Sequence, residues 1–208
     1  VEPNYKIQAF GVPNDTFFSQ QWGHHNTGQT LSSKVGTNDA DIDAPEAYDI
    51  FTGGGSSIIA VIDTGILLTH EDLSANLWDG SAGCKDENNN VITGGCPHNG
   101  WDYVNNDNDP SDDSGHGTLV AGVVGAKGNN SKGISGVNQT VRIMSLKTLD
   151  SSGRGDVADS IKAINFAKNN GAKVINASYG SSSFSQTEKD AIDAFPGLGV
   201  AAAGNSGK

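Results

Sequence analysis

A histidine between two glycines is the residue of this sequence best suited to catalysis. His116 stands between Gly115 and Gly117, after an acidic loop and before the small-residue stretch at 118–122. An imidazole gains or loses its proton near neutral pH and therefore suits a general base, and glycine neighbours let backbone or substrate come close. An isolated Gly-His-Gly also suits a capping or core histidine, so its partners must decide.

Two further polar side chains are expected at the ends of buried strands. Asp63 follows an apolar run at 57–62, and Asn205 follows another at 198–203. Such runs are typical of parallel strands buried on both faces, and ligands gather at the carboxyl ends of these strands. An aspartate that orients an imidazole, the imidazole itself and an amide that donates to an oxyanion make up most of an acyl-transfer site.

This chemistry needs elements that bring the side chains together. Apolar runs predict strands at 57–62, 141–146, 173–178 and 198–203. Helices are predicted after Asp43, whose side chain is placed to cap the first turn, after Gly115, over 156–170, and after the capping residue Ser185. Strands that alternate with helices in this way predict an α/β fold in which helices cover both faces of a parallel sheet.

The charge balance restricts the partners. The 208 residues contain 13 Lys and Arg against 24 Asp and Glu, a formal net charge of −11. This excess argues against nucleic acid or an anionic membrane as partner and favours cations. No apolar run is long enough to span a bilayer. Cys84 and Cys96 are close enough to close a small surface loop by a disulfide, which suits a secreted protein, or they are two free thiols.

Three segments together resemble a known family. Ile-Ala-Val-Ile-Asp-Thr-Gly-Ile at 59–66, Gly-His-Gly-Thr at 115–118 followed by Val-Ala-Gly at 120–122, and Ala-Ala-Ala-Gly-Asn at 201–205 match, in order and spacing, motifs of the subtilisin-like serine proteases. The chain resembles the amino-terminal part of their catalytic domain. The resemblance implies a three-layer, mostly parallel sheet flanked by helices and incomplete at the C-terminus. Residues 15–208 would form a partial catalytic domain, and residues 1–14 a propeptide remnant or N-terminal arm.

The resemblance also assigns catalytic roles. Asp63 would orient and support the imidazolium, His116 would take the proton from a serine, and Asn205 would donate its amide to the oxyanion. The sequence departs from the family at Leu119, where many members carry a second histidine, and it contains no Gly-Thr-Ser-Met-Ala nucleophile segment. We therefore expect a secreted endopeptidase whose triad serine lies in a missing C-terminal part, and a chain that is inactive alone.

Substrate contacts follow from the same resemblance. An extended peptide, or the protease's own propeptide, would add a strand to backbone at 151–155 and 178–180, while small residues after 201 wall a side-chain pocket. Ordinary turn chemistry is the alternative for both segments. The expected substrate-binding residues are Ser152, Gly153, Arg154, Ser178, Tyr179, Gly180, Ala203 and Gly204.

Calcium is the cofactor that the resemblance implies. The loop at 128–134 resembles the family's calcium loop, and hard oxygen donors from three separate segments suit this ion. The expected ligands are the Asp15 and Asp72 carboxylates, the Asn130 side chain and the carbonyls of Gly128, Lys132 and Ile134. A solvated turn with unrelated surface acids is the alternative. A second site would use Asp102, Asp107 and Asp109, which otherwise form a hydrated acidic loop.

Two other functions compete with the protease hypothesis. Asp-Thr-Gly at 63–65 is also the signature of aspartic proteases, but that mechanism needs a second copy, which the sequence lacks, or a symmetric dimer. A non-catalytic, calcium-binding domain with the subtilase scaffold is the other alternative. A downstream Gly-Thr-Ser segment would decide in favour of a serine peptidase.

Overall fold

The computed structural model describes residues 11–93 and 99–205. Its helices are the 3₁₀ turns η1 (Phe18–Gln20) and η2 (Ser74–Asn76) and the α-helices α1 (Ala44–Ile50), α2 (His116–Gly125), α3 (Val157–Asn169) and α4 (Gln186–Asp193). Its strands are β1 (Thr30–Leu31), β2 (Lys34–Val35), β3 (Ile58–Asp63), β4 (Gly100–Asp102), β5 (Arg142–Lys147), β6 (Val174–Ala177) and β7 (Leu198–Ala201).

Five of the strands form one parallel sheet in the order β4-β5-β3-β6-β7. The central strand β3 pairs with β5 on one side and with β6 on the other. The strands that follow β3 in the sequence therefore lie on both sides of it, and the direction in which strands are added to the sheet changes beside β3. Ligands of open parallel sheets bind at the carboxyl ends of the strands beside such a point. The residue that ends β3 there is Asp63.

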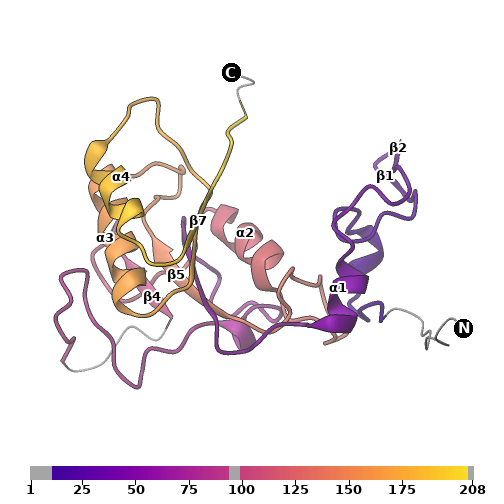
Figure 1. Cartoon of the computed structure of the whole chain (residues 1–208), viewed down its shortest axis with the longest axis horizontal. Coiled ribbons are helices and arrows are strands. Elements are labelled where there is room, and N and C mark those ends of the chain that lie inside the picture. Colours follow the sequence, from indigo (N-terminus) through magenta and orange to yellow (C-terminus); the bar gives the residue numbers. More distant parts are fainter. Residues whose placement is uncertain (1–10, 94–98, 206–208) are drawn as a thin grey trace, which may run out of the picture.

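Helices cover both faces of this sheet. Along β3, Ala60 and Ile62 belong to a core cluster that includes residues of α3 and α4, whereas Val61 belongs to a second cluster that includes Ala121 of α2. Successive side chains of a strand point to opposite faces, so one apolar run can supply both cores. Figure 1 accordingly shows α3 and α4 on one side of the strands and α2 on the other. The predicted three-layer α/β fold is confirmed.

The predicted elements differ from the observed ones in a few places. The four predicted strands are present, but β4 was not predicted, because three residues within an acidic loop give no periodic signal. Gly100 starts β4 with φ 148°, and an added Cβ would lie 1.6 Å from the Ser145 carbonyl oxygen of β5. The side-chain cap expected from Asp43 is wrong: its backbone is left-handed, with φ 54°, and its carboxylate caps nothing. The cap at Ser185 is confirmed, because its Oγ accepts the Glu188 N–H.

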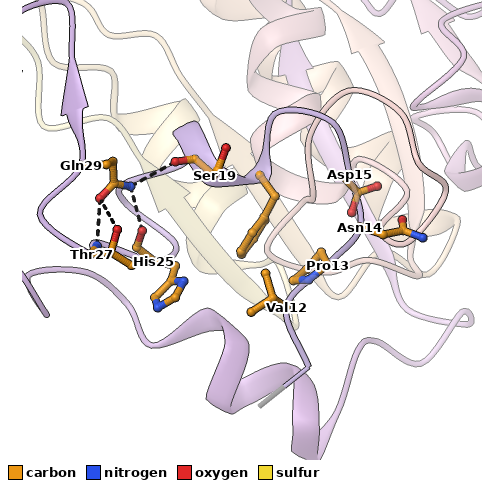
Figure 2. A pocket seen from close by; sticks show the side chains of 9 residues that line it. Val12, Pro13, Asn14, Asp15, Ser19, His25, Thr27 and Gln29 are labelled. Atoms are coloured by element: carbon orange, nitrogen blue, oxygen red, sulfur yellow. Dashed lines mark hydrogen bonds between the residues drawn. The ribbon is translucent and has the colours of Figure 1, made fainter. Parts of the chain in front are cut away.

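The first described residues form a separate layer beyond α2 (Figure 1). Phe18 of η1 packs against Ala44 and Tyr48 of α1 in a small core. The Tyr48 hydroxyl donates to the Gly136 carbonyl at 2.8 Å, which ties this layer to the loop after α2. A hollow of about 270 Å³ lies within the layer, between residues 12–15 and the segment around His25. Figure 2 shows how Gln29 closes one wall by donating to the Ser19 and His25 carbonyls.

No helix among residues 11–93 and 99–205 has the length and apolar character needed to cross a lipid bilayer.

Candidate active site

A buried carboxylate and a half-exposed imidazole meet at the carboxyl end of β3. Asp63 is fully buried, and its Oδ1 lies 2.6 Å from Nδ1 of His116, the first residue of α2. The His116 side chain is 51% exposed. A carboxylate held against Nδ1 fixes the tautomer and orientation of an imidazole, which leaves Nε2 to exchange a proton with a reaction partner.

The glycine after His116 allows this close approach. A Cβ added at Gly117 would lie 2.2 Å from the Gly65 carbonyl oxygen and 3.2 Å from Asp63 Oδ1. The start of α2 can therefore pack directly against the end of β3 only without a side chain at this position. Asp63 Oδ1 also accepts the Thr64 N–H at 2.7 Å, while Oδ2 is buried without a hydrogen-bond partner among the described residues.

Asp112 joins the strand end to the helix start. Its Oδ1 accepts the Thr64 hydroxyl at 2.9 Å and the Gly115 N–H at 2.9 Å, and its Oδ2 accepts the Thr118 N–H at 3.0 Å. Thr64 Oγ1 in turn accepts the Gly117 N–H at 2.9 Å. Burial raises the pKa of Asp112, but hydrogen bonds from Thr118, Gly115 and Ser114 outweigh it and hold the pKa below its ordinary value. Our sequence reasoning missed this residue, although an aspartate just before a helix start is a typical capping signal.

A buried lysine supports the same strand end. Lys147 lies beside Asp63 in the pairing of β5 with β3, and it is 1% exposed. Its Nζ donates to the carbonyl oxygens of Thr64 at 2.8 Å and Leu149 at 3.0 Å and to the Asp113 carboxylate at 2.6 Å. Buried charges persist only when paired and hydrogen-bonded, as here. The sequence signal was a lysine at the end of an apolar strand, which our reasoning did not use.

The third predicted catalytic residue, Asn205, has no hydrogen bond to Asp63 or His116. Asn205 follows β7 and is exposed, as are Ala203 and Gly204. Within the described part of the chain, no hydrogen bond engages the Asn205 side chain. An exposed amide donor after a parallel strand is free to bind a ligand, so its oxyanion role stays a prediction.

The two predicted substrate segments meet at one cavity. It encloses about 570 Å³ at the carboxyl ends of β6 and β7, and its lining includes Gly153, Arg154, Tyr179 and Gly180. Ser152, Ser178, Ala203 and Gly204 are not among the lining residues. The loop at 150–154 is also an ordinary turn, because Asp150 Oδ1 accepts the Ser152 and Arg154 N–H groups.

The structure gathers the residues predicted to bind the first calcium ion. Asp15 Oδ2 accepts the Asn129 N–H at 2.9 Å, and Asp72 Oδ2 accepts the Ile134 N–H at 2.8 Å, so both buried carboxylates contact the loop at 128–134. Asn130 donates its amide to Asp72 Oδ1 at 2.7 Å. Residues that lie far apart in the sequence therefore converge on one loop.

The donor chemistry of this loop suits a hard cation. No hydrogen bond from a described residue reaches the carbonyl oxygens of Gly128, Lys132 or Ile134. The Lys132 ammonium pairs with Glu71 at 2.9 Å, which leaves Asp15 and Asp72 without an ion pair in the described residues. Two buried carboxylates and three carbonyl oxygens that accept no hydrogen bond from the described residues are ligands that calcium prefers. The residues present therefore fit the implied ion.

The carboxylates predicted for a second ion have local partners. Asp102 is buried, and its Oδ1 accepts the Val104 N–H at 2.7 Å, while Asp107 and Asp109 each accept an N–H two residues further along. Residues 11–93 and 99–205 contain no cluster of three or more His, Cys, Asp or Glu side chains arranged to hold a metal. Cys84 is buried, and Cys96, its predicted partner, lies outside the described residues. The second ion and the disulfide stay predictions.

Comparison with known proteins identifies the family. Residues 54–208 match the family model described as the subtilase family. The chain belongs to the subtilase family. It is 37% identical over 210 aligned residues to the thermophilic serine proteinase of a Bacillus species, covering 99% of the chain and 44% of that protein. It is 34% identical to thermitase of Thermoactinomyces vulgaris, covering 94% of the chain and 59% of that protein. The chain thus spans about half the length of these relatives.

Solved protease structures share the fold. A protease from Pseudoalteromonas arctica aligns with a TM-score of 0.69 at 26% identity, covering 94% of the chain and 60% of that structure. A cold-adapted subtilisin-like serine proteinase aligns with a TM-score of 0.60 at 26% identity, covering 89% and 56%. The five-stranded parallel sheet and its flanking helices are therefore those of a subtilisin-like fold.

Proposed function

We propose that this chain supplies the base and the orienting carboxylate of a secreted subtilisin-like serine endopeptidase. The observation that carries the proposal is the 2.6 Å contact between the fully buried Asp63 and the half-exposed His116. Membership of the subtilase family and similarity to named serine proteases support the reaction class. The reaction is hydrolysis of a peptide bond through an Asp-His-Ser triad.

Each residue has one task in this mechanism. His116 accepts the proton of a serine hydroxyl at Nε2 as the serine attacks the scissile carbonyl, and it later gives that proton to the leaving amine. Asp63 holds Nδ1–H and stabilises the imidazolium that forms between these steps. Asn205 donates its side-chain amide to the developing oxyanion, a contact worth about 3 kcal/mol in the transition state.

The nucleophile is assigned to a part of the protease beyond these 208 residues. The sequence contains no Gly-Thr-Ser-Met-Ala segment, and the relatives are about twice as long. All four residues of the edge strand β7 are exposed, including Leu198 at 62% and Val200 at 45%. β7 pairs with β6 along one edge, and its outer edge has no partner strand among the described residues, so it is a suitable docking place for further strands of the same domain. We propose that residues 15–208 form the partial catalytic domain and that residues 1–14 belong to the propeptide junction or an arm.

The same proposal places an extended peptide along 151–155 and 178–180. Both segments border the cavity of about 570 Å³, and backbone pairing with an added strand gives affinity that does not depend on sequence. Ala203 and Gly204 would wall the pocket for the side chain next to the scissile bond. The protease's own propeptide would occupy these contacts before maturation. A disulfide between Cys84 and Cys96 accords with secretion.

Calcium would bind at the loop of residues 128–134. Asp15, Asp72, Asn130 and the carbonyls of Gly128, Lys132 and Ile134 would hold it, and the ion would screen two buried carboxylates while tying the first described residues to the body. It would act on stability rather than on a chemical step. A second ion at Asp102, Asp107 and Asp109 is part of the same proposal.

Chelation is expected to lower the melting temperature. At free calcium about 100 times the dissociation constant, one site adds about 2.7 kcal/mol, which corresponds to about 5–10 °C for a domain of this size. Differential scanning fluorimetry with and without a chelator measures the shift. Asp72→Asn should abolish the calcium response, whereas Glu71→Gln, which changes an exposed neighbour, should retain it. A wild-type melting curve unaffected by chelator would contradict the site.

Inhibitor class tests the proposed reaction. The full protease should cleave an unstructured peptide, and a serine-directed phosphonate should abolish the cleavage while a pepstatin-like statine has no effect. Sensitivity to the statine alone would favour the aspartic protease alternative. Absence of cleavage by a purified, calcium-stabilised full protease would favour the non-catalytic scaffold.

A further inference from the structure

We propose that the cavity between the two substrate segments selects a lysine or arginine side chain of the peptide through the carboxylate of Glu188. This inference rests on the proposed function, because it takes the segments at 151–155 and 178–180 to bind substrate. It goes further by naming a specificity-determining residue and the class of side chain that it recognises. Three features of the cavity carry it: its apolar lining, its polar lining and its charge.

The walls suit a long aliphatic stem. Leu149, Val157 and Ile192 line the cavity together with the small residues Ala177 and Ala201. At about 570 Å³ it has room for a large extended side chain. Lysine and arginine bury their methylene stems against such apolar surface while the charged end seeks a polar partner.

The lining of this cavity includes a carboxylate. Glu188, in the first turn of α4, lines it beside Tyr179, and the Tyr179 hydroxyl donates to Glu188 Oε1 at 3.4 Å. Burial raises the pKa of Tyr179 to about 12, so this phenol stays protonated and can only donate to the carboxylate near neutral pH. The buried hydroxyl of Ser160 also lines the cavity. The cavity is therefore bordered by a carboxylate and two hydroxyl-bearing side chains, which are acceptors that an ammonium or guanidinium can use.

The charge of Glu188 is not neutralised by the chain. No ion pair engages it among residues 11–93 and 99–205, and its side chain is only partly exposed. The other charged residues that line the cavity, Arg154 and Asp156, are exposed and opposite in sign. The neighbouring hollow of about 290 Å³ shares both of them and adds Asp150 and Asp159, of which Asp159 is paired with Lys162. Without that pair, Glu188, Asp156 and Asp150 still outnumber Arg154. The surroundings of the cavity thus carry an excess of negative charge that favours a cation.

Other side chains fit this cavity less well. An acidic side chain would meet Glu188 as a like charge. An apolar side chain would remove water from the carboxylate without offering it a partner, and such desolvation is costly. A lysine or arginine side chain supplies both the apolar contact and the missing counter-charge.

A positional-scanning peptide library, cleaved by the full protease, tests the assignment. At one substrate position we expect lysine and arginine to exceed norleucine by about fivefold in kcat/KM, the size of a partly exposed ion pair. Glu188→Gln, which keeps the shape and an oxygen that can accept the Tyr179 hydroxyl, should remove this preference by lowering kcat/KM for the lysine and arginine peptides relative to the norleucine peptide. Asp190→Asn is the matched control, because Asp190 is an exposed acid on the same helix and does not line the cavity.

The outcomes separate this inference from the proposed function. Loss of the basic preference in Glu188→Gln but not in Asp190→Asn supports it, and so does weakening of the preference at high salt. Cleavage with no basic preference at any position, or a preference that Glu188→Gln retains, overturns the inference and leaves the protease intact. Absence of cleavage of every peptide overturns the proposed function and this inference with it.

Discussion

Replacing Asp63 by asparagine is expected to lower kcat for peptide hydrolysis by about 10⁴-fold, with a small change in KM. Asparagine has the same shape, and its oxygen can still accept the Thr64 N–H that Asp63 accepts at 2.7 Å. It lacks the negative charge that stabilises the His116 imidazolium. Steady-state kinetics of the full protease on a fluorogenic peptide measure the effect.

The control for this variant is an aspartate outside the site. Asp193 lies on α4, where its exposed carboxylate pairs with Lys189. Asp193→Asn should keep kcat within about twofold, because an exposed ion pair contributes little. Both variants should melt near the wild-type temperature, which excludes misfolding as the cause. If Asp63→Asn retains at least a tenth of the wild-type kcat, Asp63 is not the orienting carboxylate.

The second large effect concerns stability. Lys147→Met is expected to reduce the free energy of unfolding by about 3 kcal/mol, because the Thr64 and Leu149 carbonyls lose their buried donor. Methionine matches the lysine stem, so the change tests the ammonium group rather than the volume. Urea titration followed by fluorescence measures the loss through its midpoint and slope.

An exposed lysine gives the comparison for this prediction. Lys162 on α3 pairs with Asp159 at 2.7 Å, and its side chain is 46% exposed. Lys162→Met should cost about 0.5 kcal/mol or less. Equal losses for the two variants would contradict the role of Lys147 as the internal support of the strand end. Lys147→Arg, which keeps the charge, should recover part of the stability.

The sequence predicted the parts of the fold that depend on local pattern. The apolar run before Asp63 predicts a buried strand because only a sheet covered on both faces needs two apolar faces, and β3 supplies Ile62 to one core and Val61 to the other. The start of α2 at His116 followed from the small residues after it. The contact between Asp63 and His116 could be predicted only from the family motifs, because the number of residues between them does not determine their distance in space.

Other features depend on contacts that no local pattern contains. Lys147 belongs to the site only because β5 pairs with β3, and Asp112 only because the loop before α2 returns to Thr64. β4 is a strand because Gly100 can approach Ser145 closely. Asp43 has the residue type of a cap, but its left-handed backbone prevents the side-chain cap. In each case long-range geometry overrides the preference of the residue itself.

The labelling of a serine by a fluorophosphonate tests the central claim most directly. In the full protease the probe should modify one serine, located by mass spectrometry, and His116→Ala should slow the modification by at least about 10³-fold, because the serine loses its general base. Labelling at an unchanged rate in His116→Ala, or no labelled serine in an enzyme that cleaves peptides, would contradict the account in which Asp63 and His116 activate a serine.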